Sequence, residues 1–167
     1  MKKVFHGSNI VVQEPLVSIG RKNLDFGLGF YVTVLAEQAD EWAGNKARYF
    51  MQAEGYVSQY EFDMDAAMAA FRYHKFEAYD REWLRFIVRN RDGGDDWKQW
   101  DIIEGGVAND RVIDTVENYR AGLIDEETAL RLLSQHQPNH QICIVKQEVV
   151  DKYLRFTDSY LVKAYVE

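Results

Sequence analysis

Two spacings of apolar residues alternate along the chain, and each predicts a different kind of element. Short runs rich in β-branched and aromatic residues predict strands at residues 3–5, 30–34, 56–62, 100–103, 141–145 and within 154–166. Apolar residues at helical spacing predict an amphipathic helix from Ala36 to about Met51 and a second helix with Asp80 as its N-cap. Two shorter helices are expected on either side of Gly122, the second one capped by Asp125. This mixture predicts an α+β fold.

Length and apolar content indicate one folded unit. The 167 residues contain no internal repeat and no linker rich in proline or serine, and 47% of them are apolar, which is enough for one core. We therefore expect a single domain over residues 1–167. The aromatic and methionine side chains between Phe62 and Phe76 are expected in its core rather than in a patch that faces a partner.

Charge and composition disfavour several classes of protein. With 20 basic against 27 acidic residues the net charge is −7, which disfavours broad binding to polyanions but leaves room for a local basic patch that holds one pair of phosphates. No apolar run approaches the roughly 18 residues of a membrane span, and we expect a cytoplasmic protein with no membrane partner. Cys143 is the single cysteine. His136 and His140 have the spacing of a helical metal pair, but Pro138 lies between them, so we expect no bound metal.

Three stretches carry residues suited to chemistry, and each has an ordinary structural alternative. His6-Gly7-Ser8 follows the first predicted strand and would place an imidazole, a bare backbone and a hydroxyl at a strand end, or else simply form a turn. Residues 25–33 form a glycine loop that runs into an aromatic strand. They lack the lysine of a P-loop and the helix of a dinucleotide fingerprint, so a bulged strand entry is the alternative. Asn139-His140-Gln141 places polar residues at the mouth of a buried strand, where an edge position is the alternative.

Taken together, the three stretches resemble the ADP-ribosyltransferases of the diphtheria-toxin and poly(ADP-ribose) polymerase branch, whose motif is His-Tyr-Glu. The order here is His-Gly-Ser, then Phe-Gly-x-Gly-Phe-Tyr, then a polar residue that opens a late apolar strand. More closely, residues 5–9, 20–33, 38–43, 101–110 and 139–144 are similar to a bacterial family of domains of unknown function in that superfamily. The resemblance implies an ADP-ribosyltransferase-like split β-sheet core with peripheral helices. It also implies NAD as a co-substrate.

The resemblance assigns roles to individual residues. The catalytic set would be His6, which bonds to the adenosine-side ribose, Tyr31, which stacks on nicotinamide, and Gln141, which reaches the nicotinamide ribose. The backbone of Gly7 would pair with the nicotinamide carboxamide, and the Ser8 hydroxyl would lie near the ring. The other expected contacts to NAD come from the glycine-rich loop, namely Arg21, Asn23, Asp25 and Gly29. Arg21 and the neighbouring Lys22 are the best-placed cations for the phosphates, with a solvated loop as the alternative.

Gln141 stands where the class usually has glutamate. A glutamine orients a ribose by hydrogen bonds, but it supplies neither a negative charge nor a general base. We therefore expect single transfer of ADP-ribose to an unknown protein or nucleic-acid acceptor, with NAD hydrolysis or an inactive NAD-cleft binding module as alternatives. Asp25 or Asp101 would supply the missing carboxylate, or else each only caps a loop or solvates a strand end.

Partners follow from the resemblance alone. The bacterial relatives look like toxins or effectors that are paired with a small antitoxin protein, so a toxin or phage-defence role is a hypothesis. Transfer of an RNA 2′-phosphate to NAD is disfavoured, because the acidic sequence contains no cluster of arginine and lysine that would bind the RNA.

Overall fold

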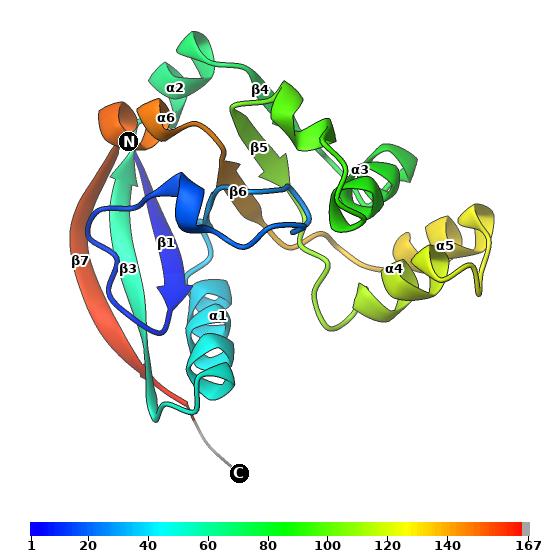
Figure 1. The fold of residues 1–167 in the computed structure, drawn as a ribbon, viewed down its shortest axis with the longest axis horizontal. Helices are drawn as coiled ribbons and strands as arrows, with labels where there is room; N and C mark the ends of the chain where they lie inside the picture. Colours follow the sequence, from blue (N-terminus) through cyan, green and yellow to red (C-terminus); the bar gives the residue numbers. More distant parts are fainter. Residues whose placement is uncertain (165–167) are drawn as a thin grey trace.

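The computed structural model describes residues 1–164 and shows an α+β chain whose strands form two sheets (Figure 1). The three-stranded sheet has the order β1-β3-β7 and is antiparallel throughout, with β1 (Lys2–Ser8), β3 (Glu54–Phe62) and β7 (Leu154–Lys163). The four-stranded sheet has the order β2-β6-β5-β4, with β2 (Phe30–Val32), β6 (Gln141–Ile144), β5 (Ile102–Gly105) and β4 (Tyr73–Lys75). Only the β4–β5 pair in this sheet is parallel.

The two sheets meet at β1 and the segment that follows β2. Phe5 and Thr33 exchange two backbone hydrogen bonds, with N···O distances of 2.8 and 2.9 Å. The long loop of residues 9–29, drawn in blue, crosses from the three-stranded sheet toward the four-stranded one (Figure 1). This arrangement brings the end of β1 close to β2, although more than 20 residues separate them in sequence.

Six helices surround the sheets in residues 1–164. They are α1 (Ala36–Tyr49), α2 (Met64–Ala70), α3 (Arg81–Arg91), α4 (Ile113–Arg120), α5 (Glu126–Leu133) and α6 (Gln147–Tyr153). Helix α1 packs on β1 and β3 through the buried small residues Ala39, Ala43 and Ala47, which let the helix approach the sheet closely. Helices α3, α4 and α5 lie beyond the four-stranded sheet (Figure 1). Two short 3-10 turns, η1 (Val17–Ile19) and η2 (Asp96–Gln99), complete the elements.

Local sequence signals located the starts of α3 and α5 and the break between α4 and α5 correctly. Asp80 accepts a hydrogen bond from the backbone N–H of Trp83 at 2.9 Å, and Asp125 accepts one from Thr128 at 2.8 Å, so both predicted N-caps are confirmed. Gly122 separates α4 from α5 with a φ of +75°, a conformation that glycine adopts at little cost. The predicted helix from Ala36 is also confirmed. The predicted last strand is seen as β7, and its expected continuation to residue 166 lies outside the described residues.

Three short elements were not predicted. Helix α2, strand β4 and helix α6 span only three to seven residues each, too few for a clear period. The side chains expected in the core around α2 are mostly there: Phe62, Met64 and Phe76 are buried, whereas Met68 is exposed. One placement was wrong, because β1 continues to Ser8, so His6-Gly7-Ser8 ends the strand rather than following it.

No helix within residues 1–164 combines the length and the apolar character that a membrane crossing requires.

Candidate functional site

A cleft of about 870 Å³ opens between the end of β1, the loop of residues 9–29, helix α1 and the start of β6. This volume lies in the range of about 300 to 1,000 Å³ that is typical of small-molecule sites. The cleft gathers eight of the nine residues expected to bind NAD or act on it. These are His6, Gly7, Ser8, Arg21, Asp25, Gly29, Tyr31 and Gln141. Residues near the N-terminus therefore line the same cleft as Gln141, which lies more than 100 residues later in the sequence.

Strand register explains why two of these side chains share a wall. Tyr31 of β2 lies opposite Cys143 of β6 in the antiparallel pair. Gln141 precedes Cys143 by two residues, and side chains two apart in a strand point to the same face of the sheet. Tyr31 and Gln141 consequently face the same side of the four-stranded sheet, and both line the cleft.

His6 is neutral and has one ring nitrogen left for a ligand. Its Nδ1 lies 2.6 Å from the carbonyl oxygen of Tyr31, and because a carbonyl only accepts, Nδ1 carries the proton. Nε2 is then the acceptor. Burial lowers the pKa of His6 from 6.5 to about 4, and the nearby Lys46 lowers it as well. The imidazole also packs on Phe30, with ring centroids 4.3 Å apart.

Gly7 is required by helix packing as well as by the cleft. A Cβ at this position would lie 2.1 Å from the carbonyl oxygen of Ala39 and 2.6 Å from the backbone nitrogen of Ala43, both in α1. Phe5 directs its N–H and C=O toward Thr33, and backbone groups two residues apart in an antiparallel strand point the same way. Gly7 therefore presents its N–H and C=O at the cleft edge of β1.

Tyr31 lines the cleft, and its hydroxyl is already engaged by the glycine loop. The hydroxyl donates to the carbonyl of Gly27 at 2.6 Å and accepts from the N–H of Phe26 at 3.1 Å. Burial raises the pKa of Tyr31 well above its usual value, and the neighbouring Cys143 and Asp25 raise it further. The phenol thus stays protonated and fixes the glycine loop beside the cleft.

Gln141 opens β6 and is buried, with 3% of its surface exposed. Its Nε2 donates to the carbonyl of Gly106 at 3.1 Å. Because a carbonyl only accepts, this bond identifies the amide atom that faces Gly106 as the nitrogen. Oε1 is therefore the atom that can accept a hydrogen bond from another donor. The side chain can accept a hydrogen bond from a ligand hydroxyl, but it brings no charge.

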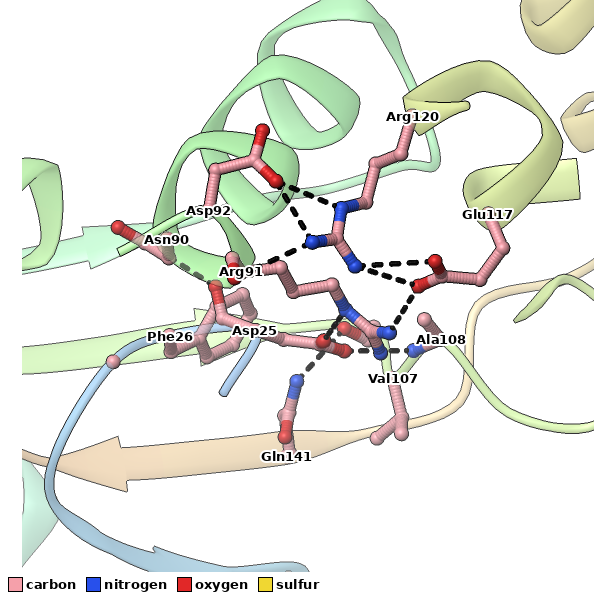
Figure 2. Close-up of polar contacts among 12 residues, drawn as sticks. Asp25, Phe26, Asn90, Arg91, Asp92, Val107, Ala108, Glu117, Arg120 and Gln141 are labelled. Atoms are coloured by element: carbon pink, nitrogen blue, oxygen red, sulfur yellow. Dashed lines mark hydrogen bonds and ion pairs between the residues drawn. The ribbon is translucent and has the colours of Figure 1, made fainter. Parts of the chain in front are cut away.

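Asp25 is the sole acidic residue that lines the cleft within residues 1–164, and its carboxylate is fully engaged. Oδ1 pairs with Nε of Arg91 at 2.6 Å, and Oδ2 accepts from the N–H of Ala108 at 3.1 Å. Arg91 also pairs with Glu117 at 2.8 Å, and Glu117 pairs with Arg120 of the same helix. Figure 2 shows this chain of ion pairs, which ends at Asp92, above Gln141. The network therefore holds the Asp25 carboxylate in one position.

Three residues considered for the site lie elsewhere. Asp101 pairs with Arg72 at 3.0 Å and also accepts from the Arg72 backbone N–H, so it is held outside the cleft. Asn23 is exposed with a φ of +61° and does not line the cleft, which leaves it the role of shaping the loop. Lys22 does not line the cleft either.

Sequence reasoning missed two cations of the cleft, Lys46 and Arg91. Burial lowers the pKa of Lys46, and the positive charge of Arg21 lowers it further, so these two cations lie near each other. Lys46 was recognisable, because Trp42, Lys46 and Tyr49 fall on one face of the predicted helix. Arg91 gave no local signal, since its contact to Asp25 joins residues 66 positions apart.

The mouth of the cleft carries exposed apolar side chains. They come from the loop after β1 and from the end of α1, and they are Ile10, Leu16, Ile19, Tyr49 and Phe50. Exposed patches of this kind mark binding surfaces more often than single exposed side chains do. In the part of the chain that the structure describes, no group of three or more His, Cys, Asp or Glu side chains is arranged to hold a metal ion.

The fold and the cleft define a two-sheet α+β protein with a mixed polar and aromatic cleft. The model of the family described as "Protein of unknown function (DUF3990)" matches residues 2–156, and the chain belongs to this family. No curated protein and no solved structure matches the chain. The matched range includes every residue of the candidate site.

Proposed function

We propose that the cleft binds NAD and that the protein transfers a single ADP-ribose from it to a macromolecular acceptor. The observation that carries the proposal is the convergence of His6, Tyr31 and Gln141 on one cleft from β1, β2 and β6. The division of the strands into a three-stranded and a four-stranded sheet supports the ADP-ribosyltransferase-like split core that the sequence resemblance implies.

Each wall of the cleft suits one part of NAD. The free N–H and C=O of Gly7 would pair with the nicotinamide carboxamide, and Tyr31 would stack on the ring. Nε2 of His6 would accept a hydrogen bond from a ribose hydroxyl. Arg21 and Lys46 would neutralise the two phosphates, which answers the need for a local basic patch in an acidic protein.

The Gln141 end limits the chemistry. Nicotinamide departs through a transition state with positive charge at the anomeric carbon, and a carboxylate would stabilise that charge. Gln141 would orient the ribose through Oε1 but stabilise the charge only weakly. Asp25 has both oxygens bonded, to Arg91 and to Ala108, so it adds little free negative charge. We therefore expect slow turnover and single transfers rather than chain growth.

The test is incubation of the protein with NAD labelled on its adenine, with and without cell lysate. We expect free nicotinamide together with label on protein or nucleic acid. Tyr31→Ala and Gln141→Ala should each lower nicotinamide release at least tenfold, because each removes one contact to the reacting part of NAD. His6→Ala should lower it at least tenfold as well, because it removes the hydrogen bond that holds the adenosine-side ribose in place. His136→Ala and Gln135→Ala are the matched controls, since both residues lie outside the cleft.

The alternatives give different results in the same experiment. Nicotinamide with free ADP-ribose would indicate an NAD glycohydrolase. NAD binding measured by calorimetry without turnover would indicate a binding module, which the uncharged Gln141 favours. Absence of both binding and turnover would overturn the proposal.

A toxin role remains part of the proposal, and growth tests it. Expression in bacteria should arrest growth, and His6→Ala should relieve the arrest. The apolar mouth around Ile19, Tyr49 and Phe50 would offer a small antitoxin protein a surface from which to cover the cleft. Normal growth of cells that contain active protein would contradict the toxin role but not the transferase activity.

A further inference from the structure

His140, which directly precedes Gln141, is held through both nitrogens of its ring. Nε2 lies 2.7 Å from a carboxylate oxygen of Glu104, and Nδ1 lies 3.3 Å from the backbone nitrogen of Val34. The Val34 N–H only donates, so Nδ1 is the acceptor and the proton sits on Nε2, from where it is donated to Glu104. The ring thereby connects β5 with the segment that follows β2.

The backbone of His140 is held as well, by one buried side chain of α1. Oε1 of Gln38 accepts from the His140 N–H at 3.3 Å, and Nε2 of Gln38 donates to the His140 carbonyl. The Gln38 amide thus pairs with residue 140 in the way a neighbouring strand would. Gln38 is 7% exposed, so water competes little for these bonds.

Glu104 completes the arrangement as a buried carboxylate with two donors. The Tyr73 hydroxyl donates to its Oε1 at 2.5 Å, while His140 donates to Oε2. Burial acts to raise the pKa of Glu104, but the hydrogen bonds from His140 and Tyr73 outweigh it and hold this pKa below the usual value. The carboxylate is therefore charged at neutral pH, and charge-assisted bonds of this kind are stronger than neutral ones.

We propose that Gln38, Glu104 and His140 are positioning residues that fix Gln141 relative to helix α1. The inference rests on the proposed function for its catalytic meaning. Helix α1 also carries Lys46, which lines the cleft as Gln141 does. The three positioning residues, which we call the clamp, therefore also set the distance between Lys46 and Gln141. A change of about 1 Å in such a distance can cost about a hundredfold in rate.

The first test separates positioning from stability. Gln38→Ala removes both bonds to His140, and Asp101→Asn is the control, since it weakens a buried polar contact outside the cleft. Both variants should unfold at lower temperature than the wild type. Only Gln38→Ala should lower kcat for nicotinamide release, at least tenfold, while KM for NAD changes less than twofold. Gln38→Glu keeps the acceptor but loses the donor. Its kcat should lie between those of the wild type and Gln38→Ala. The same variant replaces Gln38→Ala in the test if the alanine variant fails to fold.

The second test needs no turnover. The side-chain amide signals of Gln141 can be assigned in an NMR spectrum by their loss in Gln141→Ala. They should shift in Gln38→Ala and Gln38→Glu and stay in place in Asp101→Asn. The clamp would be overturned if the Gln141 amide signals did not shift in the Gln38 variants. It would also be overturned if Asp101→Asn lowered kcat as much as Gln38→Ala does. Shifted signals in a protein that neither binds nor cleaves NAD would instead overturn the proposed function and leave the clamp standing.

Discussion

The cleft is built differently around His6 and around Gln141. Near His6, the backbone of Gly7 packs directly against the backbone of α1. Near Gln141, an ion pair between Asp25 and Arg91 fixes the lining of the cleft. We call these two parts of the cleft the His6 end and the Gln141 end. Helix α1 lies so close to Gly7 that a Cβ atom at position 7 would overlap its backbone. Asp25 instead is fixed by an ion pair and a backbone N–H, from α3 and from the loop after β5.

The two ends of the cleft should therefore tolerate different changes. A backbone contact depends on shape and is indifferent to charge, so the His6 end should respond to added volume. A partly buried ion pair depends on the balance of its two charges, so loss of one partner at the Gln141 end should destabilise the protein.

Gly7→Ala should destabilise the protein by about 3 kcal/mol or more, measured by urea unfolding. The new Cβ would meet two backbone atoms of α1, and neither can rotate away as a side chain would. Gly44→Ala is the matched control, because Gly44 lies in α1 with only the flexible Arg48 side chain nearby, at 3.5 Å. Alanine there should be neutral or stabilising by up to about 1 kcal/mol. Equal losses in both variants would show that the His6 end is not limited by shape.

Asp25→Asn should cost about 2 to 3 kcal/mol in the free energy of unfolding. It leaves Arg91, whose side chain is 20% exposed, without its nearer carboxylate. The exposed pair between Arg155 and Glu61 provides the control, and Arg155→Ala should cost no more than about 0.5 kcal/mol. A loss in Asp25→Asn as small as in the control would remove the contrast between the two ends.

His6 should make stability depend on pH in a window that belongs to the His6 end. The pKa of His6 is lowered from 6.5 to about 4. Between pH 6.5 and pH 4, His6 is therefore protonated in the unfolded chain and neutral in the folded chain. The contribution is complete above pH 6.5 and is lost as the pH falls toward 4, by about 2 kcal/mol between pH 7 and pH 5. His6→Gln should lack this slope in unfolding experiments at each pH. A slope that persists in the variant would assign the window to another group.

Sequence and structure agree best where the signal is local. The caps at Asp80 and Asp125 and the turn at Gly122 lie within a few residues of the atoms they bond to or the helices they separate, so their pattern is legible in the chain itself. Short elements such as β4 were missed, because three residues carry no measurable period. Asn23 and Asp101 were plausible by residue type, yet the structure places one in an exposed turn and the other in a pair with Arg72.

The alternation of helices and strands, the helix caps and the three polar stretches that carry the candidate chemistry can all be read from the sequence. Three features appear only in the folded structure, namely the pairing of Arg91 with Asp25, the closeness of Lys46 to Arg21, and the hydrogen bonds from Gln38 to the residue before Gln141. They are hidden in the sequence because they join residues that are far apart along the chain. A cap is a bond between near neighbours, whereas these contacts join residues from about 25 to about 100 positions apart, and only the packing of the two sheets and α1 brings them within reach.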